Sequence, residues 1–117
     1  MTLIEKNKLI VDVLLRKYGW HSHSEGYVEL EGYEFINDFA DGLAFWNLGN
    51  LKFDSDSNWQ WLCVKRIAEI EEVSTLKAFH LLEAFYPFAE PVSEKLQLFE
   101  AIVNYTIHRK DFINSLK

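Results

Sequence analysis

The sequence lacks a second cysteine, a long uninterrupted apolar run and any tract rich in proline or glycine. A single cysteine, Cys63, cannot form a disulfide within the chain, so nothing indicates an oxidising compartment. Near the N-terminus, Glu5 and Asp12 interrupt the apolar residues, which argues against a signal peptide and against a membrane-spanning helix. We therefore expect a cytoplasmic protein with no membrane contact.

The absence of a linker also bears on domain organisation. A length of 117 residues suits one domain, which we predict to span residues 1–117. Because 49% of the residues are hydrophobic and 15% are aromatic, the chain has the composition of a domain that buries a core.

Positive charge is scarce in the middle of the chain. Residues 18–64 contain eight acidic residues against Lys52 alone, a net charge of −7, whereas the whole chain carries −6. The flanking segments are nearly neutral, with +2 for residues 1–17 and −1 for residues 65–117. A phosphate backbone would be repelled by the middle segment, so we expect no direct binding of nucleic acid there.

The clearest predicted element is an N-terminal helix over residues 3–18. Thr2 and Glu5 match a capping box, and Gly19 suits a left-handed C-terminal cap. The expected apolar face of this helix contains Ile4, Val11, Leu14 and Leu15.

Two further helices are predicted in the C-terminal half. Ser57 and Gln60 match a second capping box, for a helix that ends near Glu72. Ser93 is the expected cap of a last helix that runs to about Asn114. The apolar faces of these two helices are predicted to contain Trp61, Val64, Ile67 and Ala68, and Leu96, Phe99, Val103 and Ile107.

The segment between these helices, residues 74–88, is apolar nearly all round and fits either a helix or a strand. If it is helical, Ser74 is the expected cap. Tyr86 is biased out of the helical region because a proline follows it.

Alternating residues predict a small sheet. Val28 and Leu30 alternate with acidic residues after a loop over residues 20–26, which is typical of a hairpin with one wet face. Residues 43–53 are predicted to form a second pair of strands, with a short helix over residues 36–40 as an open alternative before them. The predicted fold class is α+β, with a small antiparallel sheet at about residues 27–53 packed against an N-terminal helix and two or three C-terminal helices.

The sequence offers two weak metal motifs. Asp54, Asp56 and Asn58 resemble the first half of an EF-hand calcium loop, but Trp59 and Lys65 stand where such a loop needs Gly and Glu. The same D-x-D residues are also what the start of a helix favours.

His21 and His23 place two imidazoles on one side of an extended chain and could bind zinc together with His80 or His108. Because no sequence signal identifies further converging ligands, we predict no metal site and no cofactor. Cys63 is expected to be a small buried residue, and the motifs of serine hydrolases, zinc proteases and phosphate-binding loops are missing. We therefore predict no catalytic residues and no enzymatic activity.

The most distinctive residues are Trp59 and Trp61. Residues two apart do not share a helix face, so we expect one tryptophan in the core and the other on the hairpin or exposed.

Three blocks of this sequence carry a resemblance: residues 1–10 read MTLIEKNKLI, residues 51–56 and 59–62 read LKFDSD and WQWL, and residues 100–105 read EAIVNY. They resemble a family of short uncharacterised proteins of Bacteroidetes and their phages, whose start reads M-T-x-x-E-K-N-K-L-I. Residues 51–56 followed by 59–62 are similar to its L-K-[YF]-H-x-[SD]-W-[DN]-W-L signature, and residues 100–105 to its last helix. Ser57 and Asn58 depart from the signature as an insertion. The resemblance implies a phage or prophage setting and a helix–sheet–helix fold, and it carries no activity.

The acidic segment, its interleaved aromatics and the phage resemblance favour a non-catalytic protein that binds a basic host protein surface. Such a surface is typical of nucleic-acid-handling proteins, so the partner is predicted to be a host nuclease or a CRISPR-type effector that this chain inhibits. The expected partner-binding residues are Glu29, Glu31, Tyr33, Glu34, Asp38, Asp41 and Trp46. Three alternatives stay open: a solvated acidic face with a housekeeping role, a homodimer, and a small-molecule or nucleotide-signal binder between sheet and helices.

Overall fold

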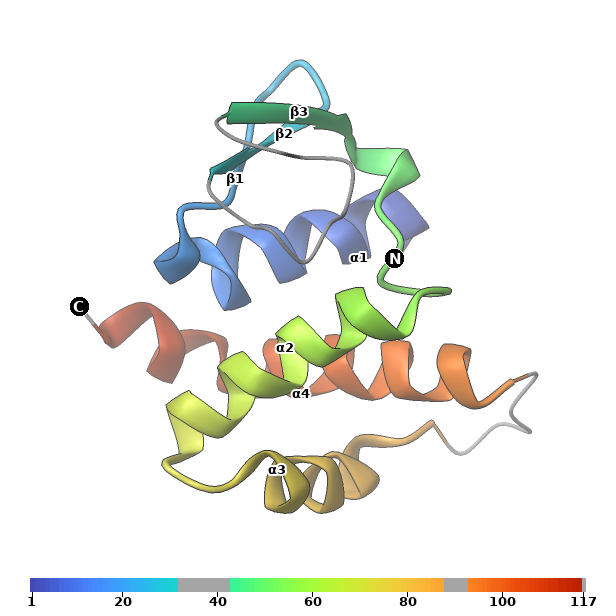
Figure 1. The fold of residues 1–117 in the computed structure, drawn as a ribbon, viewed down its shortest axis with the longest axis vertical. Helices are drawn as coiled ribbons and strands as arrows, with labels where there is room; N and C mark the ends of the chain where they lie inside the picture. Colours follow the sequence, from blue (N-terminus) through green and yellow to red (C-terminus); the bar gives the residue numbers. More distant parts are fainter. Residues whose placement is uncertain (32–42, 88–92, 117) are drawn as a thin grey trace.

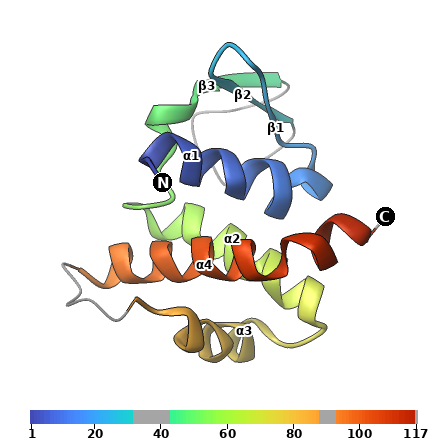
Figure 2. The ribbon, with the colours of Figure 1, turned by 180° about the vertical axis from the view of Figure 1, so that it is seen from behind.

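The sheet lies at one end of the molecule and helices form the rest (Figure 1). The computed structural model describes residues 1–31, 43–87 and 93–116. After the sheet come the N-terminal helix, then α2 (Ser57–Glu71) and α4 (Glu94–Ser115), and α3 (Thr75–Leu82) lies at the far end (Figures 1 and 2). The predicted α+β class is confirmed. None of the helices in the described ranges is long and apolar enough to cross a membrane.

The N-terminal helix is one helical segment with three geometries. It starts as α1 (Leu3–Leu9), continues as a π-helical turn, η1 (Ile10–Leu14), and closes with a 3₁₀ turn, η2 (Arg16–Tyr18). The predicted capping box is confirmed: the Glu5 N–H donates to Thr2 Oγ1 at 3.2 Å, and the Thr2 N–H donates to Glu5 Oε1 at 2.9 Å.

This segment ends at Gly19, whose φ of 88° is the left-handed conformation that glycine adopts at low steric cost. Its apolar face starts later than predicted, because Ile4 is exposed in the first turn. The first turns are instead attached through Asn7, a buried residue whose Nδ2 donates to the Leu48 carbonyl at 2.8 Å.

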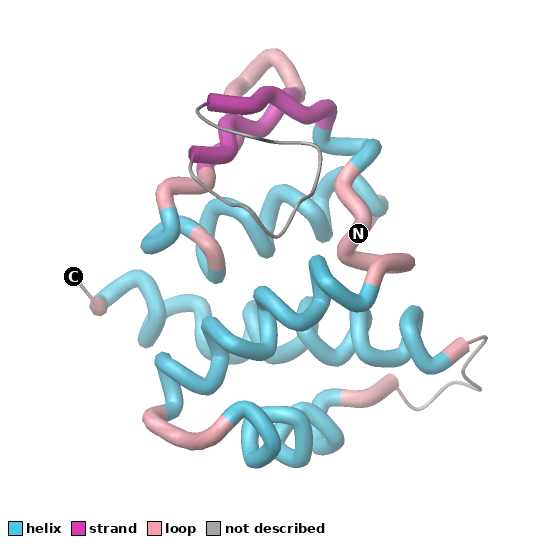
Figure 3. Tube along the Cα trace, viewed as in Figure 1, coloured by secondary structure: helices cyan, strands magenta, loops and turns pink. Residues whose placement is uncertain are grey.

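Among the described residues, three antiparallel strands form the sheet, in the order β1-β2-β3 (Figures 1 and 3). They are β1 (His21–Ser22), β2 (Tyr27–Glu31) and β3 (Leu43–Asn47). The prediction of a loop over residues 20–26 is wrong at His21–Ser22, which pair with Glu29 and Val28. A two-residue polar edge strand has no apolar alternation of its own, so its pairing depends on the neighbouring strand.

The predicted second pair of strands over residues 43–53 is also wrong. Only β3 forms, and a 3₁₀ turn, η3 (Leu48–Asn50), follows it. Asn47 initiates this turn, because its Oδ1 accepts the Gly49 N–H at 2.9 Å. Leu51 and Phe53 then enter the core from an irregular segment.

The predicted cap of α2 is wrong by one residue. Asp56 is the N-cap, with its Oδ1 accepting the Asn58 N–H at 2.8 Å. Gln60 does not complete a capping box, because its buried side chain donates to the Phe53 carbonyl at 2.8 Å and to the Lys95 carbonyl at 2.7 Å. The helix ends at Glu71 with Glu72 as its C-cap, close to the predicted end near Glu72.

The ambiguous segment over residues 74–88 is helical in its first part. Ser74 caps α3, and a 3₁₀ turn, η4 (Glu83–Phe85), follows. Tyr86 is extended, with φ −65° and ψ 143°, as its position before a proline predicts. Ser93 caps α4, as expected.

Aromatic rings connect the sheet to α2. The Trp59 ring lies 5.3 Å from Trp46 of β3, 5.8 Å from Trp20 and 5.2 Å from Phe53, each in an edge-to-face arrangement. We call these four residues the aromatic cluster. Trp61, by contrast, is 48% exposed, so the predicted division between the two tryptophans is confirmed.

The assignment of Trp61 to the apolar face of α2 is wrong, and so is that of Ile107 to the apolar face of α4, because both side chains are exposed. Which face of each helix is buried depends on the elements that pack against it. Here the N-terminal helix lies between the sheet and the layer of α2 and α4, and α4 contacts η1, α2 and α3 (Figures 1 and 2).

Candidate functional site

The sheet end of the molecule is built from the acidic middle segment. All three strands, η3 and the first turns of α2 come from residues 18–64 (Figure 1). The described acidic residues of this segment are Glu25, Glu29, Glu31, Asp54 and Asp56. In the part of this segment that the structure describes, the only basic residue is Lys52. Three of these acids, Glu25, Glu29 and Glu31, lie in β2 or in the loop before it, and Asp54 and Asp56 lie just before α2.

The structure describes three of the seven predicted partner-binding residues. Glu29 and Glu31 lie in β2 and Trp46 lies in β3. The remaining four, Tyr33, Glu34, Asp38 and Asp41, fall outside the described residues, as does the alternative short helix over residues 36–40. Their predicted role stays a prediction.

Trp46 belongs to the inner side of the sheet. It is the register partner of Val28, which is fully buried, and its ring packs on Trp59. Lys52 Nζ lies 5.9 Å from the centre of the Trp46 ring. The Trp46 ring is only partly buried, so some of its surface stays accessible to solvent.

The outer side of the β1–β2 hairpin carries a polar cluster. Glu29 is the register partner of His21 and also reaches His23, so one carboxylate lies between two imidazoles. His21 Nε2 is 2.9 Å from Glu29 Oε2, and His23 Nε2 is 3.7 Å from Glu29 Oε1. We call His21, His23 and Glu29 the hairpin cluster.

The sequence indicated two of these three residues. The His-x-His spacing was assigned to one side of an extended chain, and the structure confirms that both rings share a side, 4.8 Å apart between centroids. The third member was missed. His80 lies on α3 beside Glu83, and His108 lies on α4 beside Phe85, whereas Glu29 meets the pair through strand pairing.

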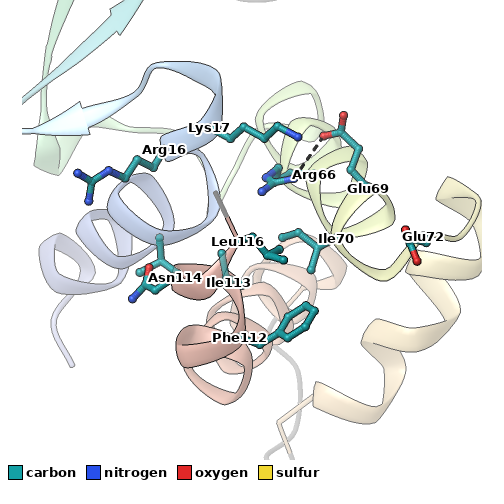
Figure 4. Close-up of a pocket in the computed structure, with 11 residues that line it drawn as sticks. Arg16, Lys17, Arg66, Glu69, Ile70, Glu72, Phe112, Ile113, Asn114 and Leu116 are labelled. Atoms are coloured by element: carbon teal, nitrogen blue, oxygen red, sulfur yellow. Dashed lines mark ion pairs between the residues drawn. The ribbon is translucent and has the colours of Figure 1, made fainter.

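A separate cleft of about 890 Å³ opens on the helical side of the molecule, between η2, α2 and the C-terminal end of α4 (Figure 4). The cleft is lined by cationic, acidic and apolar side chains. The cations are Arg16, Lys17 and Arg66, the acids are Glu69 and Glu72, and the apolar residues include Ile70 and Phe112. The predicted small-molecule site lay between sheet and helices, so this cleft is in a different place.

Arg66 is the one buried cation of this cleft among the described residues. Its Nε donates to the Leu14 carbonyl at 3.2 Å, and its Nη1 lies 3.9 Å from Glu69 Oε1. The guanidinium also lies 6.0 Å from the centre of the Tyr18 ring. Three different elements thus hold this charge in place at the cleft wall.

Two buried titratable groups lie away from both regions. Burial raises the pKa of the Cys63 thiol, so the group is protonated at neutral pH and is not an activated nucleophile. Burial, followed by a 2.8 Å hydrogen bond to Glu71, raises the pKa of the Tyr105 hydroxyl, while Arg109 beside Glu71 opposes the shift. Both environments suit structural side chains.

No protein-family model, curated protein or solved structure matches this chain.

Proposed function

We propose that this protein acts without catalysis, by binding a basic surface of another protein through its acidic sheet end. The observation that supports this most is the distribution of charge: the described part of residues 18–64, which includes the strands of the sheet, contains five acidic residues and Lys52 as its only basic residue (Figure 1). An acidic surface raises the rate of encounter with a basic one and discriminates against acidic partners.

The nature of the partner follows from its charge. Extended basic grooves are what proteins present to nucleic-acid backbones. In the phage or prophage setting that the family resemblance implies, the partner is a host nuclease or a CRISPR-type effector, and the acidic end occupies its nucleic-acid groove. Glu31, Glu34, Asp38 and Asp41 supply negative charge in this proposal, and Tyr33 and Trp46 supply aromatic contacts.

The absence of catalysis is part of the proposal. It is supported by the buried, protonated Cys63 and by the lack of a nucleophile motif in the sequence. No cofactor is required for a protein that acts by occupying a surface.

Affinity capture from a host lysate tests the proposal. The wild-type chain should capture a nucleic-acid-binding protein at low salt, less at high salt, and double-stranded DNA should displace it, because both compete for one basic groove. A Glu25→Lys/Glu31→Lys/Glu34→Lys variant should lose this partner. Glu29 is kept in that variant so that the hairpin cluster is unchanged.

The matched control reverses three exposed acids in the helical part of the molecule, Glu72, Glu83 and Asp111, to lysine. It changes the net charge by the same amount and should retain the partner. The proposal is wrong if both variants capture the same proteins as the wild type, or if DNA leaves the captured protein in place. Capture of this chain alone would favour the homodimer.

The cleft supports a second candidate, an anionic small molecule with an apolar part. Its phosphate or carboxylate would face Lys17 and Arg66, which lie side by side at the cleft, and its apolar part would pack on Ile70 and Phe112 (Figure 4). A thermal-shift screen of nucleotides tests this, with Arg66→Met as the variant that should lose the response. A shift that persists in this variant contradicts binding at the cleft.

A further inference from the structure

We propose that His21, His23 and Glu29 form a binding site for one divalent transition-metal ion of the zinc class. The three side chains each offer one ligand atom, and these atoms lie within 4.8 Å of one another. A tetrahedral zinc ion, with bonds of about 2.0–2.1 Å, needs its ligand atoms about 3.3 Å apart. Glu29 Oε2 is 2.9 Å from His21 Nε2 and Glu29 Oε1 is 3.7 Å from His23 Nε2, so the two separations lie on either side of that value.

Strand geometry explains why the three residues converge. On the inner side of the hairpin, Val28 is fully buried and the Ser22 hydroxyl is hydrogen-bonded to the carboxylate of Asp12 in η1. Side chains alternate between the two faces of a strand, so the cluster occupies the opposite, outer side. Convergence therefore results from the backbone pairing.

Contacts of Ser22 and His23 fix the part of the hairpin that carries the two imidazoles. The Ser22 N–H donates to Asp12 Oδ1 at 3.0 Å, and the Ser22 hydroxyl lies 2.8 Å from both oxygens of that carboxylate. The His23 ring is stacked on the Tyr27 ring, with 4.3 Å between the two centroids. The His23 backbone N–H donates to the Tyr27 carbonyl at 2.8 Å. Residues that orient metal-binding imidazoles commonly determine affinity.

One atom points to a ligand. His23 Nε2 is buried, and it has no hydrogen-bond partner among the described residues. Buried polar atoms are nearly always satisfied, so an unsatisfied imidazole nitrogen that faces a carboxylate needs an explanation. A metal ion between the two groups would satisfy both.

The donor set selects the ion. Two imidazoles and one carboxylate suit zinc, cobalt, nickel or copper, whereas calcium and magnesium take oxygen ligands. The cluster is open to solvent on one side, because the side chains of His21, His23 and Glu29 are 49%, 29% and 23% exposed. Water from that side completes the tetrahedron, and the ion ties the short edge strand β1 to β2.

Metal titration of the untagged chain tests the site. Zinc competition with a chromophoric chelator should give one zinc per chain, and cobalt should give the absorption spectrum of a tetrahedral site. Zinc should also raise the melting temperature by several degrees. Calcium and magnesium should do neither.

The variants locate the site. His21→Ala changes the most exposed ring and is the variant least expected to disturb the fold, and Glu29→Gln keeps the shape of the side chain while removing its charge. Each should lower zinc affinity at least tenfold and abolish the thermal shift, with an unchanged circular dichroism spectrum. His80→Ala and His108→Ala are the matched controls and should bind as the wild type does.

The proposal is overturned if the wild type binds no zinc, since the cluster is then only a pair of histidine–carboxylate contacts. It is equally overturned if the two cluster variants bind zinc as tightly as the two controls. Because the charge-reversal variant described above keeps all three ligands, partner capture and zinc binding succeed or fail independently.

Discussion

Replacing each of the two tryptophans of α2 by phenylalanine should give very different losses of stability. The two residues are two positions apart on one helix, yet Trp59 is 3% exposed and Trp61 is 48% exposed. The Trp59 ring contacts three other rings, at 5.2, 5.3 and 5.8 Å between centroids, whereas Trp61 has a ring contact with Phe79 at 5.6 Å.

The magnitudes follow from burial and from these ring contacts. Truncation of a buried tryptophan to alanine costs about 3–5 kcal/mol, and each aromatic pair contributes about 0.5–1.5 kcal/mol beyond its buried area. Trp59→Phe keeps a smaller ring in the cluster, so we expect a loss of about 2 kcal/mol in the free energy of unfolding. Trp61→Phe loses little buried area, and we expect about 0.5 kcal/mol or less.

Urea denaturation followed by circular dichroism measures the difference. With a denaturant slope of about 1.5 kcal/mol per molar, the midpoint should fall by about 1.3 M for Trp59→Phe and by about 0.3 M for Trp61→Phe. Trp59→Ala should cost about 3–5 kcal/mol, a large share of the about 5–15 kcal/mol that stabilises a small domain, and should lower the midpoint further than Trp59→Phe does. Equal midpoints for the two phenylalanine variants, or a larger loss for Trp61→Phe, would refute the assignment of Trp59 to the core.

Three further outcomes are expected. The buried Cys63 thiol should react with a thiol reagent only as fast as the chain opens, so the labelling rate should rise with denaturant concentration. Rapid labelling of the native protein would contradict the burial of this thiol. Because the folded state raises the pKa of Tyr105, chiefly by burial, the unfolded chain loses this proton first and stability falls as pH rises above about 10. Tyr105→Phe should flatten that alkaline loss in urea titrations, and an unchanged pH profile would exclude this residue as its cause. Ser22→Ala should cost about 1–2 kcal/mol and should couple with Asp12→Asn in a double-mutant cycle, whereas additive effects would show that their contact is not energetically significant.

Local signals in the sequence predicted several features correctly. The capping box of Thr2 and Glu5, the caps Ser74 and Ser93 and the left-handed Gly19 all occur where the sequence placed them. These features depend on residues three or four apart in the chain, so neighbouring residues determine them.

Local signals also competed with one another. At the start of α2, Asp56 and Ser57 are both good capping residues, and Asp56 takes the role. Gln60 fits a capping box by its spacing, but it instead connects the segment before α2 to α4 through two backbone carbonyls. Which hydrogen bond forms depends on the carbonyl groups that other segments bring to this side chain.

The candidate sites depended on contacts across the chain. The sequence determined by itself the acidity of residues 18–64, the caps Thr2, Ser74 and Ser93, and the shared side of His21 and His23. Only the tertiary structure decided that Glu29 lies between those imidazoles, because the register between β1 and β2 sets that meeting. The cleft likewise exists only because the ends of η2 and α4 meet beside α2. Spacing along one element is set by backbone geometry, whereas contact between elements is set by how their buried faces pack together.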